Sequence, residues 1–387
     1  MRKLLYFVRI ILSNLLSFLN EFIPKDENKI LFYTNQSYND NVMALLLWCT
    51  ENGYQEKFSL YSCVKISVPD SQKNIFFISR LKGLFVFLKA KYVFYDVGTT
   101  RIKPVSTQKV VQIWHGTPLK KIGRVVANTI KNDRFNDFSF IITTSEKFID
   151  IFSEAFECTV DQVKVFEYPR CDYLLKPDRH LFERYQQKTY KKNILWMPTF
   201  RNSQYGVSEY RQKKNISLPF FENAEDIGSL NEILKELDFF LTIKLHPAAV
   251  ENFLSFPNYT NIKVFTNKNF KSLNVPNYSF VACFDALITD YSSIFFDWLL
   301  LDRPLAFTVD DISEYREQRG FVFDNPFDYM PGKILQTKSQ LYDFFNDIAK
   351  DRDGYREMRN EVKRMSHSAK WQGDACKTLL DYLGIAL

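Results

Sequence analysis

Short apolar segments alternate with helix-like segments along most of this chain, and this alternation restricts the folds open to it. In such a chain each strand is followed by a crossover, which makes the sheet parallel and places helices on both of its faces. The first alternating series comprises residues 29–33, 42–49, 58–64, 92–95, 110–114 and 138–143.

A second series begins near Asn193, after the polar stretch 175–192, which lacks a strand pattern. At 387 residues the chain is too long for one ordinary domain. We therefore predict an α/β fold with two Rossmann-like domains facing a central cleft, 28–178 and 179–387. The strands expected in the second domain are 194–197, 239–244, 262–265, 286–288 and 304–307.

The first 27 residues carry apolar side chains at three- and four-residue steps, which predicts an amphipathic helix. Arg9, Asn14 and Asn20 interrupt the apolar run and disfavour a membrane-spanning segment. We expect the helix to lie on a membrane surface. The alternatives are a helix packed on the protein core and a cleaved or spanning segment. The residues predicted to meet the membrane are Arg2, Lys3, Leu5, Phe7, Arg9 and Leu12.

Charge and cysteine content exclude several classes of protein. The formal net charge is +6, and the basic residues are mixed with acidic ones, so an anionic partner such as phosphate or acidic lipid is favoured. No nucleic-acid-binding motif is present, and nucleic acid is not expected as a partner. The six cysteines form no CxxC pair, which argues against a zinc site or a disulfide framework.

The first candidate site follows the apolar segment 110–114. Ligands of open α/β sheets bind beyond the carboxyl ends of the strands, and His115 is followed there by Gly116, which permits close approach to the backbone. Thr117 is suited to cap a helix that starts at Pro118 and offers its amides to phosphate. The alternative is a buried histidine hydrogen-bonded within a tight turn.

A second candidate site lies at the end of the expected strand 239–244. Lys244 and His246 are two residues apart, so they share one face of an extended chain. Only four histidines occur in the sequence, and His115 and His246 both follow apolar strands in different halves of it. This coincidence favours a functional interpretation of both.

A third candidate site follows the strand expected at 286–288. Asp290, Ser292 and Ser293 precede an apolar helical segment, where hydroxyls and free helix amides form an anion site. Plain helix capping explains the same residues. Arg170 and Arg201 follow turns elsewhere and are suited to bidentate phosphate contacts.

Five short motifs occur in a fixed order along the chain. They are His115-Gly116-Thr117-Pro118-Leu119-Lys120, Tyr168-Pro169-Arg170, Pro198-Thr199-Phe200-Arg201, Lys244-Leu245-His246-Pro247 and Thr289-Asp290-Tyr291-Ser292-Ser293. Together they resemble the CDP-glycerol glycerophosphotransferase family of teichoic acid synthesis. The resemblance extends from about residue 31 to residue 374. The sequence departs from the usual family pattern at Asn39, Cys171 and Gln372.

The resemblance implies a GT-B-like fold, peripheral association with the cytoplasmic face of the bacterial membrane, and a CDP-glycerol or CDP-ribitol donor. The implied acceptor is linked to undecaprenyl diphosphate. His115 and His246 match the family's motif histidines and are the expected catalytic residues. The expected donor- and phosphate-binding residues are Thr117, Arg170, Thr199, Arg201, Lys244, Asp290, Ser292 and Ser293.

In the expected reaction His115 takes the proton of the acceptor hydroxyl, while His246 and Lys244 stabilise charge on the departing CMP. The roles of the two histidines are open to reversal. No protein metal site is expected, and any Mg²⁺ would accompany the donor phosphates. The chain resembles a compact primase or short-chain transferase of the family. The alternatives are a glycosyltransferase that uses a nucleotide sugar and a non-catalytic subunit of a capsule-assembly complex.

Overall fold

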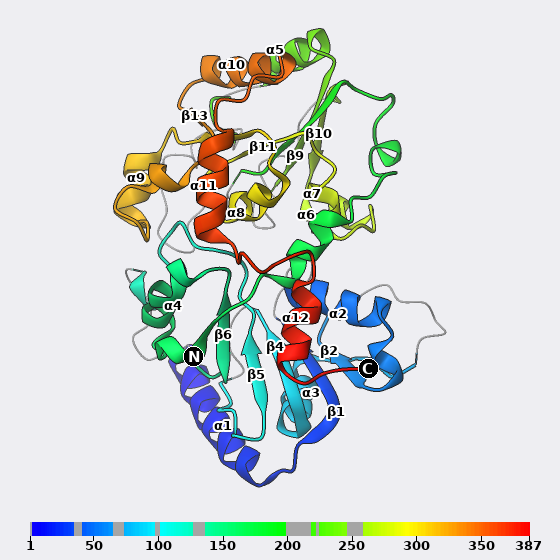
Figure 1. Cartoon of the computed structure of the whole chain (residues 1–387), viewed down its shortest axis with the longest axis vertical. Helices are drawn as coiled ribbons and strands as arrows, with labels where there is room; N and C mark the ends of the chain where they lie inside the picture. The colour runs from blue at the N-terminus through cyan, green and yellow to red at the C-terminus, as the bar shows by residue number, and fades with distance from the viewer. Residues whose placement is uncertain are drawn as a thin grey trace. The chain divides into compact units, whose positions relative to one another are not determined.

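A computed structural model describes residues 2–34, 41–64, 73–96, 101–126, 136–198, 218–221, 224–245 and 258–387, and the side chains of 2–9, 224, 267 and 268 are not among those described. The chain forms two compact units (Figure 1). The first contains residues 1–117, 123–173 and 366–387. The second contains residues 118–122 and 174–365.

The first unit contains a seven-stranded parallel sheet in the order β3-β2-β1-β4-β5-β6-β7. Its interior strand β1 pairs with β2 on one side and β4 on the other, and Ile30, Leu31 and Phe32 are fully buried. An apolar run buried on both faces is typical of a parallel sheet. The strands are β1 (Asp26–Tyr33), β2 (Ser59–Ser62), β3 (Ile75–Phe77), β4 (Ala90–Tyr95), β5 (Lys109–Gln112), β6 (Phe140–Thr143) and β7 (Val163–Val165).

The second unit contains a six-stranded parallel sheet in the order β10-β9-β8-β11-β12-β13. Strand β8 pairs in parallel with β9 and β11, and like β1 in the first sheet it is the strand beside which the strand order reverses. The strands are β8 (Lys192–Trp196), β9 (Phe239–Lys244), β10 (Ile262–Phe265), β11 (Ala286–Thr289), β12 (Leu305–Thr308) and β13 (Lys333–Leu335). The prediction of an α/β chain with two parallel sheets is therefore confirmed.

Helices accompany both sheets. Those of the first unit are α1 (Arg2–Phe22), α2 (Asn41–Glu51), α3 (Arg80–Lys89), α4 (Ile149–Phe156) and α12 (Ala375–Tyr382). Those of the second are α5 (Ala224–Glu236), α6 (Asn267–Lys271), α7 (Asn277–Val281), α8 (Ile294–Trp298), α9 (Ile312–Gln318), α10 (Lys338–Ala349) and α11 (Arg356–Ser366). Local sequence sets some of their limits, since Thr337 and Gln340 form a capping box at the start of α10.

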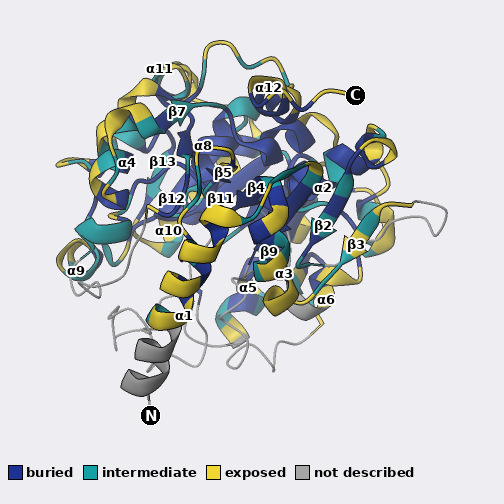
Figure 2. Ribbon diagram, turned by 90° about the horizontal axis from the view of Figure 1, so that it is seen from below, coloured by how far each residue is buried: buried dark blue, intermediate teal, exposed yellow. Residues whose placement is uncertain are grey.

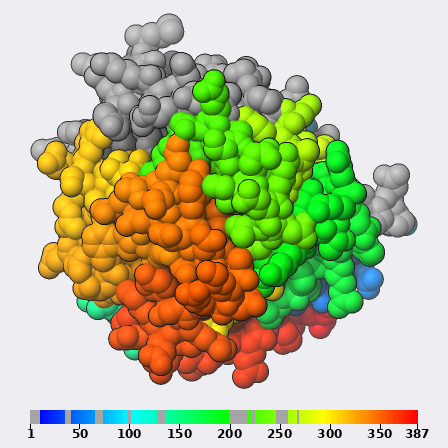
Figure 3. Space-filling model, turned by 90° about the horizontal axis from the view of Figure 1, so that it is seen from above, coloured from blue at the N-terminus to red at the C-terminus, as the bar shows by residue number. Residues whose placement is uncertain are grey.

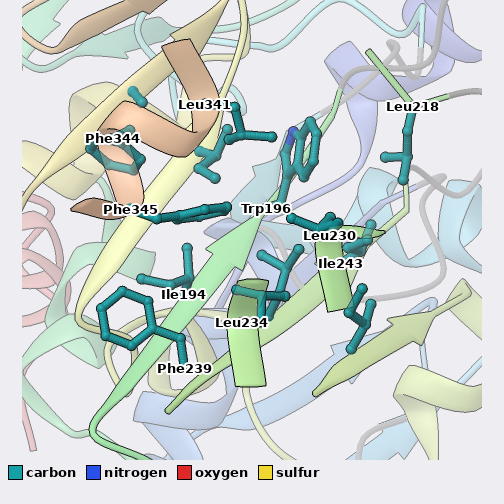
Figure 4. Packing of buried hydrophobic residues seen from close by; sticks show 14 of the residues in the cluster. Ile194, Trp196, Leu218, Leu230, Leu234, Phe239, Ile243, Leu341, Phe344 and Phe345 are labelled. Carbon is teal, nitrogen blue, oxygen red and sulfur yellow. The ribbon is translucent and has the colours of Figure 1, made fainter. Parts of the chain in front are cut away.

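Apolar packing joins α5 and α10 to one face of the second sheet. Leu230 and Leu234 of α5 and Phe345 of α10 meet Ile194 and Phe239 of the sheet in one fully buried cluster (Figure 4). The two helices lie side by side on the surface of this unit (Figure 3), where Lys338 Nζ and Asp226 Oδ1 form an ion pair at 2.5 Å.

Helix α1 attaches to the first unit by its polar side chains. Asn20 Nδ2 donates to Lys103 O at 2.9 Å and to Gln108 Oε1 at 2.7 Å, and Ser17 Oγ accepts from Lys103 N at 3.0 Å. The opposite face is apolar and exposed (Figure 2). Its exposed residues are Ile11, Leu12, Leu15, Phe18, Leu19 and Phe22. Residues 10–22 therefore pack on the first unit with Ser13, Leu16 and Asn20 buried, while most of their apolar side chains stay exposed.

The last part of the chain returns to the first unit, so the assignment of all of 179–387 to the second domain is wrong for residues 366–387. Asp172 explains the return. Its carboxylate accepts from Trp371 Nε1 at 3.1 Å, from Ala375 N at 2.8 Å and from Cys376 N at 2.9 Å. A side chain in the first unit thus caps the amino end of α12, and the sequence separation of about 200 residues hides this contact from pattern analysis.

We expect Asp172→Ala to loosen α12, because two backbone amides and an indole N–H lose their buried acceptor. The docking free energy of α12 should fall by about 2–4 kcal/mol, which raises amide exchange in residues 375–382 by about 30- to 1000-fold. Hydrogen exchange followed by mass spectrometry measures this directly. Asp381→Ala, which removes an exposed ion pair with Lys377 on the same helix, is the control and should change exchange little. Equal exchange in both variants would contradict the capping role.

Candidate active site

The two sheets bring polar side chains to the carboxyl ends of their central strands. In the first unit, strand order reverses between β1 and β4, and Thr34 Oγ1 donates to Asp96 Oδ1 at 2.7 Å there. In the second unit it reverses between β8 and β11, and Thr289 Oγ1 donates to Met197 O at 3.0 Å. Open α/β sheets bind ligands at such switch points. Each unit therefore has a candidate site at this edge of its sheet.

His115 lies in a strained turn directly after β5. Trp114 has a φ angle of 45°, which is unusual for a bulky residue, and Gly116 has a φ angle of 139°. The indole ring of Trp114 lies against the imidazole, with ring centroids 3.8 Å apart, and packs edge-on against Phe156. The His115 side chain remains partly exposed. Backbone strain of this kind persists only where the surrounding structure enforces it, and strained residues are common at functional sites.

Asn41 and Arg170 hold the backbone of this turn. Asn41 Nδ2 donates to Ile113 O at 3.0 Å and to Trp114 O at 2.8 Å. Arg170 Nη1 donates to His115 O at 2.8 Å, and Arg170 N donates to Asn41 Oδ1 at 3.3 Å. Arg170 was predicted as a phosphate ligand, but its side chain is only 4% exposed and contacts the His115 turn.

Thr117 does not cap a helix, so that prediction is wrong. Residues 118–122 instead join the second unit, where Lys120 forms a bridge with Phe321. Thr117 is fully buried, with its Oγ1 2.9 Å from Thr144 Oγ1. Because the Thr144 hydroxyl donates to Ser366 O at 2.5 Å, Thr117 is the donor to Thr144. Its role in the described structure is to fasten the chain after His115.

A buried pair of ionisable residues at the end of β7 was missed by the sequence analysis. His367 Nδ1 lies 2.8 Å from Glu167 Oε2, and both side chains are buried. The other oxygen of this carboxylate accepts from Tyr168 N at 3.1 Å. The pair therefore fixes the start of the turn that carries Arg170. The available signal was a carboxylate just after a short apolar strand, which is weak.

In the second unit, Asp290, Ser292 and Ser293 follow β11 as expected. Asp290 is fully buried, and its Oδ1 accepts from Ser292 N at 3.2 Å. Ser292 and Ser293 are partly exposed, and Ser293 occupies the position before α8 without a side-chain capping bond. The Asp290 carboxylate thus shapes the turn, while the two hydroxyls remain accessible to a ligand.

Lys244 is the last residue of β9, in the same sheet. Burial lowers the pKa of Lys244 to about 8, and its Nζ lies 4.7 Å from the ring centroid of Phe270. An ammonium with so low a pKa is poorly solvated, which strengthens its interaction with a phosphate. Lys244 and the segment after β11 both lie at carboxyl ends of this parallel sheet.

Several predicted residues lie outside the described part of the chain. These are His246, Thr199 and Arg201 and, for their side chains, Arg2, Lys3, Leu5, Phe7 and Arg9. Leu12 is described and exposed. Within the described residues no group of three or more His, Cys, Asp or Glu side chains is placed to hold a metal ion.

Comparison with known proteins identifies the family of this chain. The family model for CDP-Glycerol:Poly(glycerophosphate) glycerophosphotransferase matches residues 15–376. The chain belongs to this glycerophosphotransferase family. The resemblance inferred from the five motifs is therefore confirmed.

Relatives of this glycerophosphotransferase differ in length. This chain is 30% identical over 351 residues to the teichoic acid poly(glycerol phosphate) polymerase of Bacillus spizizenii W23. The match covers 82% of this chain and 83% of that protein. The chain is 26% identical to the polymerase of the same name from Bacillus subtilis 168, over 84% of this chain but only 45% of that protein.

A solved structure shares the fold. A histidine-to-alanine variant of the wall teichoic acid polymerase TagF superposes with a TM-score of 0.73 and 20% identity, covering 99% of this chain and 96% of that one.

The low pKa of Lys244 predicts a pH effect. The ammonium is charged below about pH 8 and loses its proton as the pH rises. If this charge binds the donor phosphates, the KM for the donor should rise about tenfold per pH unit above 8. In Lys244→Arg the guanidinium stays charged and the rise should disappear. Steady-state kinetics from pH 7 to 9.5 measure it, with Lys263→Arg, on the neighbouring strand, as control. A rise that survives in Lys244→Arg excludes Lys244 as the titrating group.

Proposed function

We propose that this protein transfers a polyol phosphate from a CDP-polyol donor to a hydroxyl of a membrane-linked acceptor in teichoic acid synthesis. The donor is CDP-glycerol or CDP-ribitol, and the acceptor is linked to undecaprenyl diphosphate. The observation that carries this proposal is the strained, partly exposed His115 turn at a carboxyl strand end in a chain of the glycerophosphotransferase family. The GT-B arrangement of the two units and the cleft between them remain predictions.

The reaction is a displacement at phosphorus. The acceptor oxygen forms a bond to the phosphorus that carries the polyol, the bond from that phosphorus to CMP breaks, and the acceptor proton passes to His115. The Trp114 ring restricts where the His115 imidazole can lie, because the two ring centroids are only 3.8 Å apart. A base held in this way contributes about 10²- to 10⁴-fold to the rate.

Charge on the departing CMP needs stabilisation by the second unit. Lys244, Ser292 and Ser293 supply an ammonium and two partly exposed hydroxyls at carboxyl ends of its strands. Thr199 and Arg201 are also predicted to bind the donor, and His246 is predicted to act with Lys244 on the departing CMP. Positioning and charge stabilisation of this kind account for most of the catalysis of phosphoryl transfer. No step is assigned to a metal ion, and Mg²⁺ bound to the donor phosphates remains a prediction.

The first test is release of CMP from CDP-glycerol and from CDP-ribitol by the purified protein with an undecaprenyl-type acceptor, followed by mass spectrometry of the lipid. We expect a product heavier by whole polyol phosphate units. His115→Asn should lower kcat by about 10²- to 10⁴-fold, because the base is lost. His180→Asn is the matched control, since His180 is exposed and pairs only locally with Glu183. Near-normal turnover by a folded His115→Asn variant excludes His115 as the base.

The same assay separates the alternatives. Turnover of a nucleotide sugar without CMP release from either CDP-polyol would indicate a glycosyltransferase. Donor binding without turnover under any acceptor condition would indicate a non-catalytic subunit. His246→Asn tests the second predicted histidine. If it lowers kcat as much as His115→Asn does, the dependence of kcat on pH in the two variants decides which histidine is the base and which acts on the leaving group.

We also propose that α1 lies on the cytoplasmic face of the bacterial membrane. In the described chain no helix is sufficiently long and apolar to cross a bilayer. The outward face of α1 carries six large exposed apolar side chains, and α3, which packs beside α1, adds exposed Leu81 and Phe85. An apolar helix face held outward by polar anchors suits the boundary between headgroups and acyl chains.

Replacing Leu12, Leu15 and Phe18 with Ser should release the protein from anionic lipid vesicles, because the exposed apolar area is removed and the buried Asn20 contacts are kept. Co-sedimentation measures the bound fraction, and donor binding checks that the fold survives. Val160→Ser, an exposed apolar position outside these helices, is the control. Unchanged sedimentation of the triple variant rules out α1 as the membrane contact.

A further inference from the structure

We infer that Asn41 and Arg170 are positioning residues that hold the His115 turn in its reactive geometry, and that Arg170 acts through this turn rather than as a ligand of the donor phosphates. The inference deepens the proposed function and rests on it, because it takes His115 as the base. It concerns residues of the first unit only.

The turn presents three successive carbonyls to these two side chains. Ile113 O and Trp114 O accept from Asn41 Nδ2, and His115 O accepts from Arg170 Nη1. Trp114 is left-handed at a φ angle of 45°, a conformation that a tryptophan adopts only when its surroundings enforce it. The bonds act on the peptide groups that flank this residue. They therefore set the direction in which the His115 side chain leaves the backbone.

Asn41 and Arg170 also hold each other. Arg170 N donates to Asn41 Oδ1 at 3.3 Å, so both ends of the asparagine amide are engaged. Asn41 begins α2 after β1, whereas Arg170 lies in the 3-10 helix η5 (Pro169–Leu175) after β7. The turn is thus fastened to segments that follow two other strands. A small movement of a catalytic base is costly, since a displacement of about 1 Å can lower a rate by about 10²-fold.

The surroundings of Arg170 agree with this role. The guanidinium is only 4% exposed and lies over the ring of Tyr168, 5.1 Å from its centroid. The peptide of Tyr168 is in turn held by Glu167, which is paired with His367. Glu167 and His367 thus support the segment that presents Arg170 to His115. A phosphate ligand needs an accessible guanidinium edge, whereas a positioning residue is best buried and rigid.

The test combines kinetics with a signal from the Trp114–His115 pair. Asn41→Ala and Arg170→Lys are compared with the wild type for kcat, for the KM of CDP-glycerol, and for tryptophan fluorescence against pH. A protonated imidazole quenches an indole in contact with it, so the pH-dependent part of Trp114 emission reports their contact. Trp114→Phe isolates this emission from that of the other four tryptophans. His115→Asn shows that His115 is the quencher.

We expect kcat to fall by about 10²-fold in Asn41→Ala while the KM for CDP-glycerol stays unchanged, and the pH-dependent quenching to be lost. Arg170→Lys should show the same pattern to a smaller extent, because a lysine retains the charge but not the planar donor geometry. The matched control is Asn261→Ala, a buried asparagine of the second unit whose Nδ2 donates to Phe239 O at 2.8 Å. It should retain both kcat and quenching.

Two results would overturn the inference. A raised KM with unchanged kcat and unchanged quenching in Arg170→Lys assigns Arg170 to the donor. The second result is a loss of activity in Asn41→Ala and Arg170→Lys that is proportional to the unfolded fraction measured by thermal melting and that Asn261→Ala matches. It would assign Asn41 and Arg170 a structural role. Failure of the proposed function is recognised separately, because the quenching needs no substrate. A wild type without CMP release refutes the function, while the fluorescence still decides whether Asn41 and Arg170 hold the turn.

Discussion

Parallel pairing on both sides of an interior strand is the constraint on which the rest of this protein depends. Strands β1 and β8 each have a parallel neighbour on either side, and in each sheet the order reverses beside that strand. All carboxyl ends of a parallel sheet lie along one edge, and the connections diverge where the order reverses. Residues far apart in sequence, such as Asn41, His115 and Arg170, therefore meet at the carboxyl edge of the first sheet.

Polar contacts over long sequence distances give the first unit two further properties. Asn20 and Ser17 attach α1 through its polar side and leave an apolar face outward, which reverses the usual orientation of a surface helix. Asp172 caps α12 and returns the end of the chain to this unit. The proposed membrane surface and the support of the His115 turn by His367 both follow from such contacts.

The long apolar strands of both sheets were predictable, because burial on both faces leaves a continuous apolar run. Strands β9 and β10 begin and end at the expected residues. The three-residue strands β3, β7 and β13 were not predicted, since each is partly exposed and too short to show a period. The helix expected after Thr117 was wrong, because residues 118–122 bridge to Phe321 and cannot also form a helical turn.

The sequence by itself determined the α/β class, the two parallel sheets, the motif order that indicates the family, and the position of His115 after a strand. The tertiary structure alone decided what surrounds that histidine. Arg170 was expected at a phosphate from its residue type, yet the fold places its guanidinium on His115 O, 55 positions away. Asn41 reaches Trp114 O across 73 positions. Residue type states what a side chain is able to bind, but the order of strands in the sheet determines which partner lies within 3 Å of it.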